Sequence, residues 1–238
     1  MKRTLIAMLT YMTLTTSAAW AQDAMHYFKR GLESSMANTR IEFFTKAVEL
    51  NPNLVEAYQK RALHYYYQRK FEKAMQDYTK VIELVPEEVE AYRMRGSAYL
   101  KNGGLEGAID NFSRAIELDP QQASAYGQRA EAYRLNGMVQ EAIRDSTKAI
   151  HLGGDARTTA NAYATRAKSY RELGNSDLAD ADFDKSFELD PRYVLYRYLA
   201  SSTSLEEVRR MGLLGIITLI AVGIFQVTLR PPKKTGQG

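Results

Sequence analysis

A block of about 34 residues recurs along this chain, and the recurrence constrains the fold more than any other feature. In its clearest copy, Tyr92, Gly96 and Tyr99 are followed by Ala108 and Pro120. The same pattern starts again at Tyr58 before this copy and at Tyr126 and Tyr163 after it. A period of this size predicts a solenoid, in which each repeat buries its apolar face against its neighbours.

The pattern resembles the tetratricopeptide repeat, a helix–turn–helix unit of about 34 residues. Four positions carry the resemblance: an aromatic, a small residue and a Tyr on the first helix, and an Ala on the second. They are filled by Tyr58, Tyr92, Tyr126 and Tyr163; by Ala62, Gly96, Ala130 and Ala167; by Tyr65, Tyr99, Tyr133 and Tyr170; and by Ala74, Ala108, Ala142 and Ala179. The resemblance implies an all-α, right-handed α-solenoid of about five helix–turn–helix repeats.

The period sets the expected repeat boundaries. Residues 22–53 are expected to form a degenerate first repeat, with an unrelated pair of capping helices as the alternative. Four regular repeats are expected at 54–87, 88–121, 122–156 and 157–191. Three extra residues within 153–159 predict a longer surface loop. The Tyr-rich residues 192–203 predict a capping segment over the last repeat, with contact to a bilayer as the alternative.

Within a repeat, the small residue predicts close contact between the two helices. In the third repeat, Glu88 to Lys101 and Leu105 to Leu118 are expected to be helical, and Gly96 is expected to admit the second helix near Phe112. An Arg recurs where the family has Leu, at Arg61, Arg95, Arg129 and Arg166. We interpret this Arg as structural, with its aliphatic stem packed and its charged head in water.

Both ends of the chain carry signs of export and of a membrane anchor. Residues 1–21 have a basic start, an apolar stretch and a small-x-small end, which predict a signal peptide cleaved before Gln22; an uncleaved anchor is the alternative. Residues 211–229 contain no formal charge, which predicts a transmembrane helix within 204–230. The short basic tail, 231–238, favours a cytoplasmic C-terminus and periplasmic repeats.

Composition narrows the function further. The net charge of +4 comes from the two ends, so the near-neutral repeats do not favour a nucleic-acid partner. The chain has no Cys, and its His residues lack metal-ligand spacing, so we expect no enzyme activity, metal or cofactor. Asn111-Phe112-Ser113 matches a glycosylation sequon, but Phe112 is a core position, so the match is taken as accidental.

In the tetratricopeptide family, the first helices line a concave groove that binds peptide segments. The resemblance therefore implies groove positions at Gln59, Leu63, Tyr66, Arg93, Ser97, Leu100, Glu131, Arg134, Lys168 and Arg171. The carboxylate clamp of some members is absent here, because Gln59, Leu63, Ser124 and Gln128 stand at its positions.

These observations predict a protein-interaction scaffold on a membrane, acting in the assembly of an envelope or secretion complex. The expected partners are a protein or peptide in the groove and the membrane through residues 211–229. A cytosolic tail-anchored receptor is one alternative, and a self-assembling repeat protein without a peptide ligand is another. The oligomeric state and the identity of the partner stay open.

Overall fold

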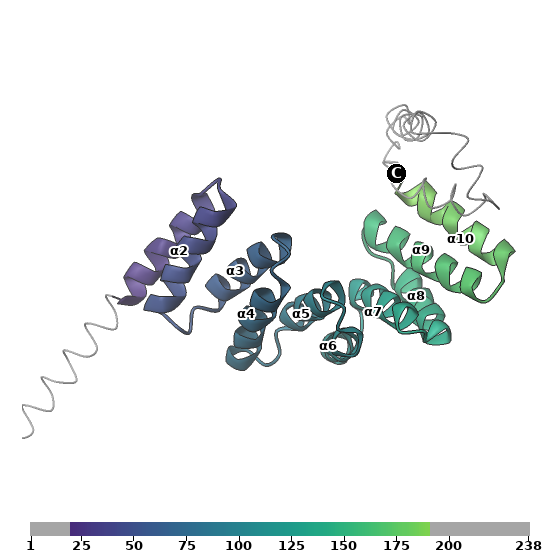
Figure 1. The fold of residues 1–238 in the computed structure, drawn as a ribbon, viewed down its shortest axis with the longest axis horizontal. Coiled ribbons are helices and arrows are strands. Elements are labelled where there is room, and N and C mark those ends of the chain that lie inside the picture. The colour runs from purple at the N-terminus through teal and green to yellow at the C-terminus, as the bar shows by residue number, and fades with distance from the viewer. Residues whose placement is uncertain (1–19, 191–238) are drawn as a thin grey trace, which may run out of the picture. The chain divides into compact units, whose positions relative to one another are not determined.

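A computed structural model describes residues 20–190, and every regular element in this range is a helix (Figure 1). The predicted capping segment, transmembrane helix and basic tail lie outside the described residues. So does the predicted signal peptide, apart from Trp20 and Ala21 at the start of the first helix. Within 20–190, no helix combines the length and apolar character that a membrane span requires.

The helices follow one another as consecutive helical hairpins. A helix over residues 20–33 is followed by α2 (Ala37–Leu50), α3 (Val55–Tyr67), α4 (Phe71–Leu84), α5 (Val89–Lys101), α6 (Leu105–Leu118), α7 (Ala123–Leu135), α8 (Val139–Leu152), α9 (Ala156–Glu172) and α10 (Ser176–Leu189). The chain divides into two compact units, Met1–Leu118 and Asp119–Gly238. Each unit is described by itself.

In the first unit, α3 packs on α4 and α5 packs on α6 through a small residue facing an aromatic ring. A methyl group at Gly96 would lie 2.9 Å from the ring of Phe112, so only Gly admits this approach. The predicted role of Gly96 is therefore confirmed. Ala62 and Tyr78 are buried in the core of the preceding hairpin.

The degenerate first repeat also forms a helical hairpin, but its contact residues are shifted. Phe28, sixteen residues before Phe44, stands where the regular repeats have a small residue, and the two rings pack at 5.7 Å. Close approach occurs at Gly31 instead, where a methyl group would meet the Phe44 ring at 2.5 Å. A large residue at the usual contact position thus moves the close approach one turn along the helix.

In the second unit, the α7–α8 hairpin has a small residue at the contact position, whereas the α9–α10 hairpin keeps the large Phe183. Ser146, which is fully buried on α8, takes the position that Tyr78 and Phe112 hold in the first unit. Four buried alanines of α9 face the interior: Ala160, Ala162, Ala164 and Ala167. Less side-chain volume between helices allows their axes to lie closer together.

The longer loop predicted at 153–159 was wrong, because most of these residues are helical. Asp155 caps α9, accepting a hydrogen bond from the Thr158 backbone N–H at 2.7 Å. As a result α9 has 17 residues, whereas α3, α5 and α7 have 13 each. The extra residues lengthen the helix at its N-terminus and leave a short connection from α8.

Candidate functional site

An aromatic cluster at the end of α3 includes Tyr66, one of the candidate groove residues of the first unit. The ring of Tyr66 meets Tyr67 at 5.9 Å and Phe71 at 5.6 Å, both edge-to-face. Tyr67 is 73% exposed, whereas Phe71 is buried in the core. Burial raises the pKa of Tyr66, so its hydroxyl stays protonated at neutral pH. The cluster therefore offers an exposed aromatic surface that is held in place by the buried Phe71.

Arg93 lies close enough to influence the charge state of Tyr66, but its own charge is already balanced. It donates to both carboxylate oxygens of Glu90, one turn earlier on α5. Burial lowers the pKa of Arg93, but the contact with Glu90 outweighs burial and raises it overall. A ligand at this position meets an ion pair with little net charge.

The other predicted groove residues of the first unit differ in how far their side chains are exposed to solvent. Ser97 is 3% exposed, and its hydroxyl donates to the Arg93 carbonyl at 3.0 Å, so little of its side chain is open to a ligand. A Ser inside a helix commonly satisfies its hydroxyl in this way. Gln59, Leu63 and Leu100 are partly exposed on α3 and α5.

In the second unit, the predicted residues of α7 and α9 form a connected ion-pair network. Glu131 accepts two hydrogen bonds from Arg134, both at 2.9 Å, and Arg134 also donates to Glu172 at 2.7 Å. Lys168 Nζ lies 3.8 Å from Glu131. Burial raises the pKa of Glu131, but Arg134 and Lys168 outweigh it and lower the pKa overall. Arg134 and Lys168 thus link two first helices.

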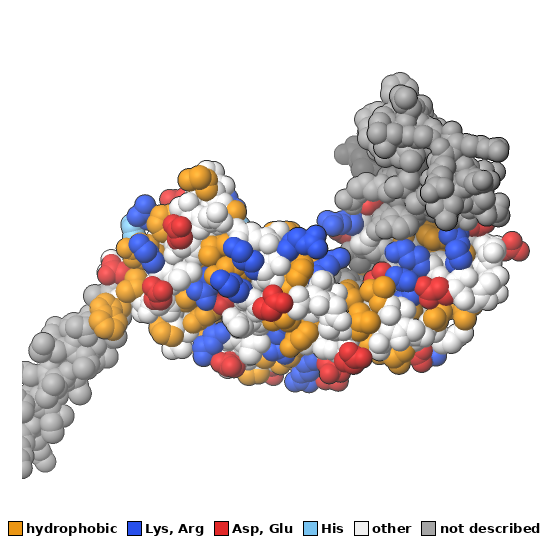
Figure 2. Space-filling model, viewed as in Figure 1, with side chains coloured by type: hydrophobic (Ala, Val, Ile, Leu, Met, Phe, Trp, Pro, Cys, Tyr) orange, Lys and Arg blue, Asp and Glu red, His pale blue; other side chains and the backbone are white. Residues whose placement is uncertain are grey.

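Arg171 does not join this network. Its guanidinium carbon lies 4.7 Å from the ring centre of Phe183, and it pairs with Asp180 at 3.3 Å, both on α10. Its prediction as a groove contact is not supported by this placement, because the side chain reaches toward the second helix of its own hairpin. Figure 2 shows basic and acidic side chains interspersed on the visible face.

A second constellation, built on the recurring arginines, connects the hairpins. In the first regular repeat, Arg61 Nε and Nη2 donate to the two oxygens of Asp77 at 2.8 and 2.7 Å. Nη1 donates to Thr45 Oγ1 on α2 at 3.1 Å. The later arginines bond to the residue sixteen positions on in the pairs Arg95–Asn111, Arg129–Asp145 and Arg166–Asp182.

The prediction that the guanidinium groups of these arginines lie in water was wrong. The side chain of Arg61 is 14% exposed and that of Asp77 only 7%. Burial lowers the pKa of Arg61, but its hydrogen bonds with Asp77 outweigh burial and raise it. Each guanidinium therefore fastens the two helices of its hairpin, and Arg61 also reaches the preceding hairpin through Thr45.

The asparagine of the sequon belongs to this constellation. Asn111 is 7% exposed; its Oδ1 accepts from Arg95 at 2.7 Å, and its Nδ2 donates to the Gly107 carbonyl at 2.7 Å. Both ends of the amide are therefore engaged inside the hairpin. This placement agrees with the interpretation of the sequon as accidental.

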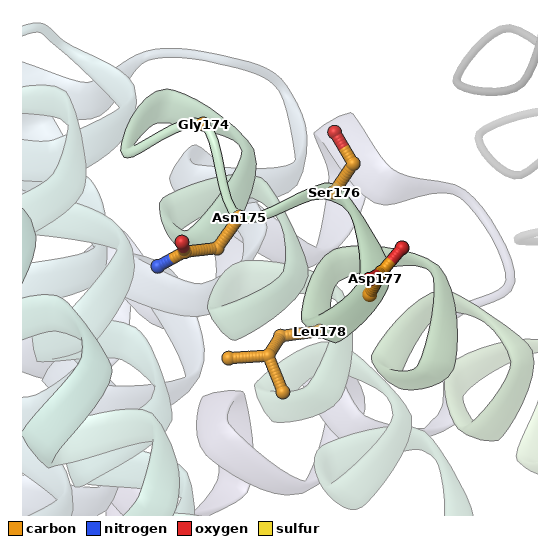
Figure 3. A pocket seen from close by; sticks show the side chains of 5 residues that line it. All are labelled: Gly174, Asn175, Ser176, Asp177 and Leu178. Carbon is orange, nitrogen blue, oxygen red and sulfur yellow. The ribbon is translucent and has the colours of Figure 1, made fainter.

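A surface depression in the described range lies at the turn between α9 and α10 (Figure 3). Asn175 and Leu178 extend toward one side of it, whereas Ser176 and Asp177 point away. Five consecutive residues line the depression, so no second element within residues 20–190 supplies an opposite wall. Among residues 20–190, no three His, Asp or Glu side chains converge in a group able to hold a metal ion.

Two family models, both for the tetratricopeptide repeat, match this chain. One matches residues 60–123 and 93–153, and the other matches residues 160–193. Together they span more than half of the 238 residues. The chain belongs to the tetratricopeptide repeat family. The matched residues fall on the regular hairpins and leave out residues 22–53, where the helix contacts are shifted.

Solved structures of tetratricopeptide repeat proteins share this fold. A crystal structure of MamA has 27% identity and a TM-score of 0.59, covering 67% of this chain and 92% of MamA. MamA 41-end from Desulfovibrio magneticus RS-1 has 18% identity and a TM-score of 0.64, covering 73% and 96%. YrrB, a TPR protein with an unusual peptide-binding site, has 21% identity and a TM-score of 0.59, covering 73% and 91%. No curated protein matches the sequence.

Proposed function

We propose that this protein is a non-catalytic interaction scaffold that binds a peptide segment of a partner protein along the first helices of its repeats. The observation that carries the proposal is the aromatic cluster of α3. Tyr67 is 73% exposed and rests edge-to-face on Tyr66, which in turn rests on the buried Phe71. Such an anchored Tyr offers contact area at little cost in side-chain entropy, as residues that dominate protein interfaces do.

The charged residues on the first helices of each unit add specificity more than affinity. Arg93 is paired with Glu90 in the first unit, and Arg134 is paired with Glu131 in the second. A ligand must replace or extend these ion pairs, so its polar groups have to match their positions. The family relationship, and the peptide-binding site named for YrrB, support a peptide or protein as the ligand class.

The proposal includes a location. The signal-peptide pattern of residues 1–21 and the apolar residues 211–229 favour repeats exported to the periplasm and tethered to the membrane. Tethering confines the groove to a thin layer and raises its effective concentration toward other envelope proteins. Assembly of an envelope or secretion complex is the process that this arrangement fits.

A photocrosslinking experiment tests the binding function. A photoreactive residue replaces Tyr67 in the full-length protein, and the control variant carries it at Asp110, an exposed residue of α6. We expect the Tyr67 probe to capture a discrete partner that the Asp110 probe does not, and we expect Arg93→Glu to reduce the yield. Capture of only the protein itself by both probes would favour the self-assembling alternative.

Sequencing the N-terminus of the purified protein tests the location. We expect the mature chain to begin at Gln22, and we expect protease added to intact spheroplasts to degrade the repeats. A chain that retains Met1 and resists protease would instead support the cytosolic tail-anchored receptor.

A further inference from the structure

Arg95 is the recurring arginine whose partner carries no charge. Its Nε donates to Asn111 Oδ1 at 2.7 Å, and its Nη1 donates to Thr79 Oγ1 at 3.0 Å. In the other regular repeats, Nη2 donates to the second oxygen of an Asp, at distances from 2.7 to 3.1 Å. Asn111 has an amide nitrogen in place of that oxygen, and this nitrogen donates to the Gly107 carbonyl. Nη2 of Arg95 therefore has no acceptor among residues 20–190.

The charge of Arg95 is uncompensated as well. Burial lowers its pKa, and the opposing influences come from Tyr99 and Tyr92, not from a carboxylate. In contrast, Asp partners raise the pKa of Arg61, Arg129 and Arg166. The buried side-chain atoms that lack a partner in the described range are Gln122 Oε1 and Ser146 Oγ. Nη2 of Arg95 is not among them, so it reaches solvent.

A second guanidinium lies near Arg95, across the ring of Tyr92. The guanidinium carbons of Arg95 and Arg114 lie 5.6 and 6.0 Å from the centre of this ring. Arg114 pairs with Glu117 at 2.9 Å on the exposed face of α6. Of these two guanidinium groups near Tyr92, only that of Arg114 is paired with a carboxylate.

We propose that Arg95 binds a carboxylate supplied by another molecule, an acidic side chain of a partner protein. The other repeats show the kind of acceptor that Nη2 lacks here, because this nitrogen bonds to a carboxylate oxygen in Arg61, Arg129 and Arg166. With Nε and Nη1 already bonded, Nη2 can donate to one oxygen of an external carboxylate, and such a charge-assisted hydrogen bond is stronger than a neutral one.

This site is separate from the groove proposed above. Residues 93 and 97 each lie two positions from Arg95, which places them about 200° away around a helix of 3.6 residues per turn. Arg95 instead faces the second helices, since its hydrogen bonds reach Thr79 on α4 and Asn111 on α6. A partner bound in the groove leaves this position open, so the two proposals fail or succeed independently.

The repeats supply matched variants for the test. Asn111→Asp provides an internal carboxylate and should close the site. Asp182→Asn should give Arg166 the same unpaired Nη2 that Arg95 has. Circular dichroism melting first establishes that both variants fold. The arginine Nε–Hε signals of the full-length protein are then followed by NMR while acetate replaces chloride at constant ionic strength.

We expect the Arg95 signal to shift with a saturable dependence on acetate in the wild-type protein. The shift should disappear in Asn111→Asp, and Arg166 should acquire one in Asp182→Asn. Hexaglutamate, as a model of an acidic segment, should saturate the Arg95 shift at a concentration at least tenfold below that of acetate.

Three outcomes would overturn the proposal. An Arg95 signal that moves no more than that of Arg166 in the wild-type protein would show that the position binds no carboxylate. A shift that persists in Asn111→Asp would place the bound anion elsewhere. Equal effects of phosphate, acetate and hexaglutamate would indicate a site for any small anion and not for an acidic protein segment.

Discussion

Arg166 and Asp182 are joined by two parallel hydrogen bonds, of 2.7 and 2.8 Å, between the two helices of the last regular hairpin. Their side chains are 18% and 9% exposed, so neither charge is well solvated when the other is removed. The guanidinium also reaches Thr147 on α8 at 3.0 Å. One side chain therefore holds α9 to both second helices beside it.

This pair predicts strong coupling in a double-mutant cycle. Asp182→Leu and Arg166→Met should each lower the free energy of unfolding by roughly 3 kcal/mol, because each leaves a largely buried charge without a partner. The double variant should lose clearly less than the sum of the two single variants. Urea denaturation of the four proteins gives these values, and additive losses would show that the two charges do not stabilise each other.

The repeat period indicated most of the fold, because each repeat restates the same contacts. The approach of Phe112 to Gly96 follows from one small and one large residue at a fixed spacing. The ion pairs were missed, although Asp77, Asp145 and Asp182 also recur and stand sixteen residues after an Arg. The family has Leu at the Arg position, which suggested that the aliphatic part of the Arg side chain packs in the core. It did not suggest that the guanidinium is also buried and needs a carboxylate partner.

The groove predictions were limited for a different reason. A helical face can be inferred from spacing, but spacing does not show whether a charged side chain is already paired. Arg134 and Lys168 both meet Glu131, and Arg171 turns toward Phe183, although all four charged residues lie on helices of one unit. Side-chain rotamers select among these partners, and only the packed structure fixes those rotamers.

The turn between α3 and α4 predicts a stabilising substitution. Arg69 has φ of 60°, whereas the other regular hairpins place Gly103, Gly137 and Gly174 at this position with φ between 77° and 85°. A side chain in this left-handed region costs about 1 kcal/mol relative to Gly. Arg69→Gly should therefore raise the free energy of unfolding by about 1 kcal/mol in urea denaturation.

Gly137→Ala is the matched control, since a methyl group there meets no atom within 4 Å and adds only backbone strain. It should lower stability by a similar amount. A loss of stability in Arg69→Gly would mean that the Arg69 side chain contributes more than its backbone strain costs.

The contact between Gly96 and Phe112 predicts that a larger side chain at position 96 lowers the stability of the protein. A methyl group at Gly96 already approaches the Phe112 ring to 2.9 Å and Asn111 Cβ to 3.2 Å. Gly96→Leu should therefore separate α5 from α6 and cost about 1–3 kcal/mol as overpacking. Gly127→Ala is the control, because its methyl group would sit 3.8 Å from Ala149, an ordinary contact. An unchanged melting temperature in Gly96→Leu would show that this contact yields to a larger side chain.

His64 predicts how the first unit responds to acid. Its ring stacks on Phe44 of α2 at 5.9 Å, and burial, together with Arg40 and Lys60, lowers its pKa below 6.5. The folded state therefore favours the neutral imidazole, and this contribution to stability is complete above the unfolded pKa of about 6.5. It is lost as the pH falls below 6.5 toward the folded pKa, because the unfolded chain then binds more protons.

His64→Phe should remove this part of the pH dependence while it keeps the stacked ring. Melting temperatures between about pH 7.5 and about pH 5 should thus fall less in the variant than in the wild-type protein. His151→Gln serves as the control, since His151 is exposed at the end of α8 and should leave the wild-type profile unchanged. Parallel profiles for His64→Phe and the wild-type protein would assign the acid sensitivity in this range to other groups. Glu131 is not one of them, because its pKa is lowered and its contribution to stability is lost only below about pH 4.5.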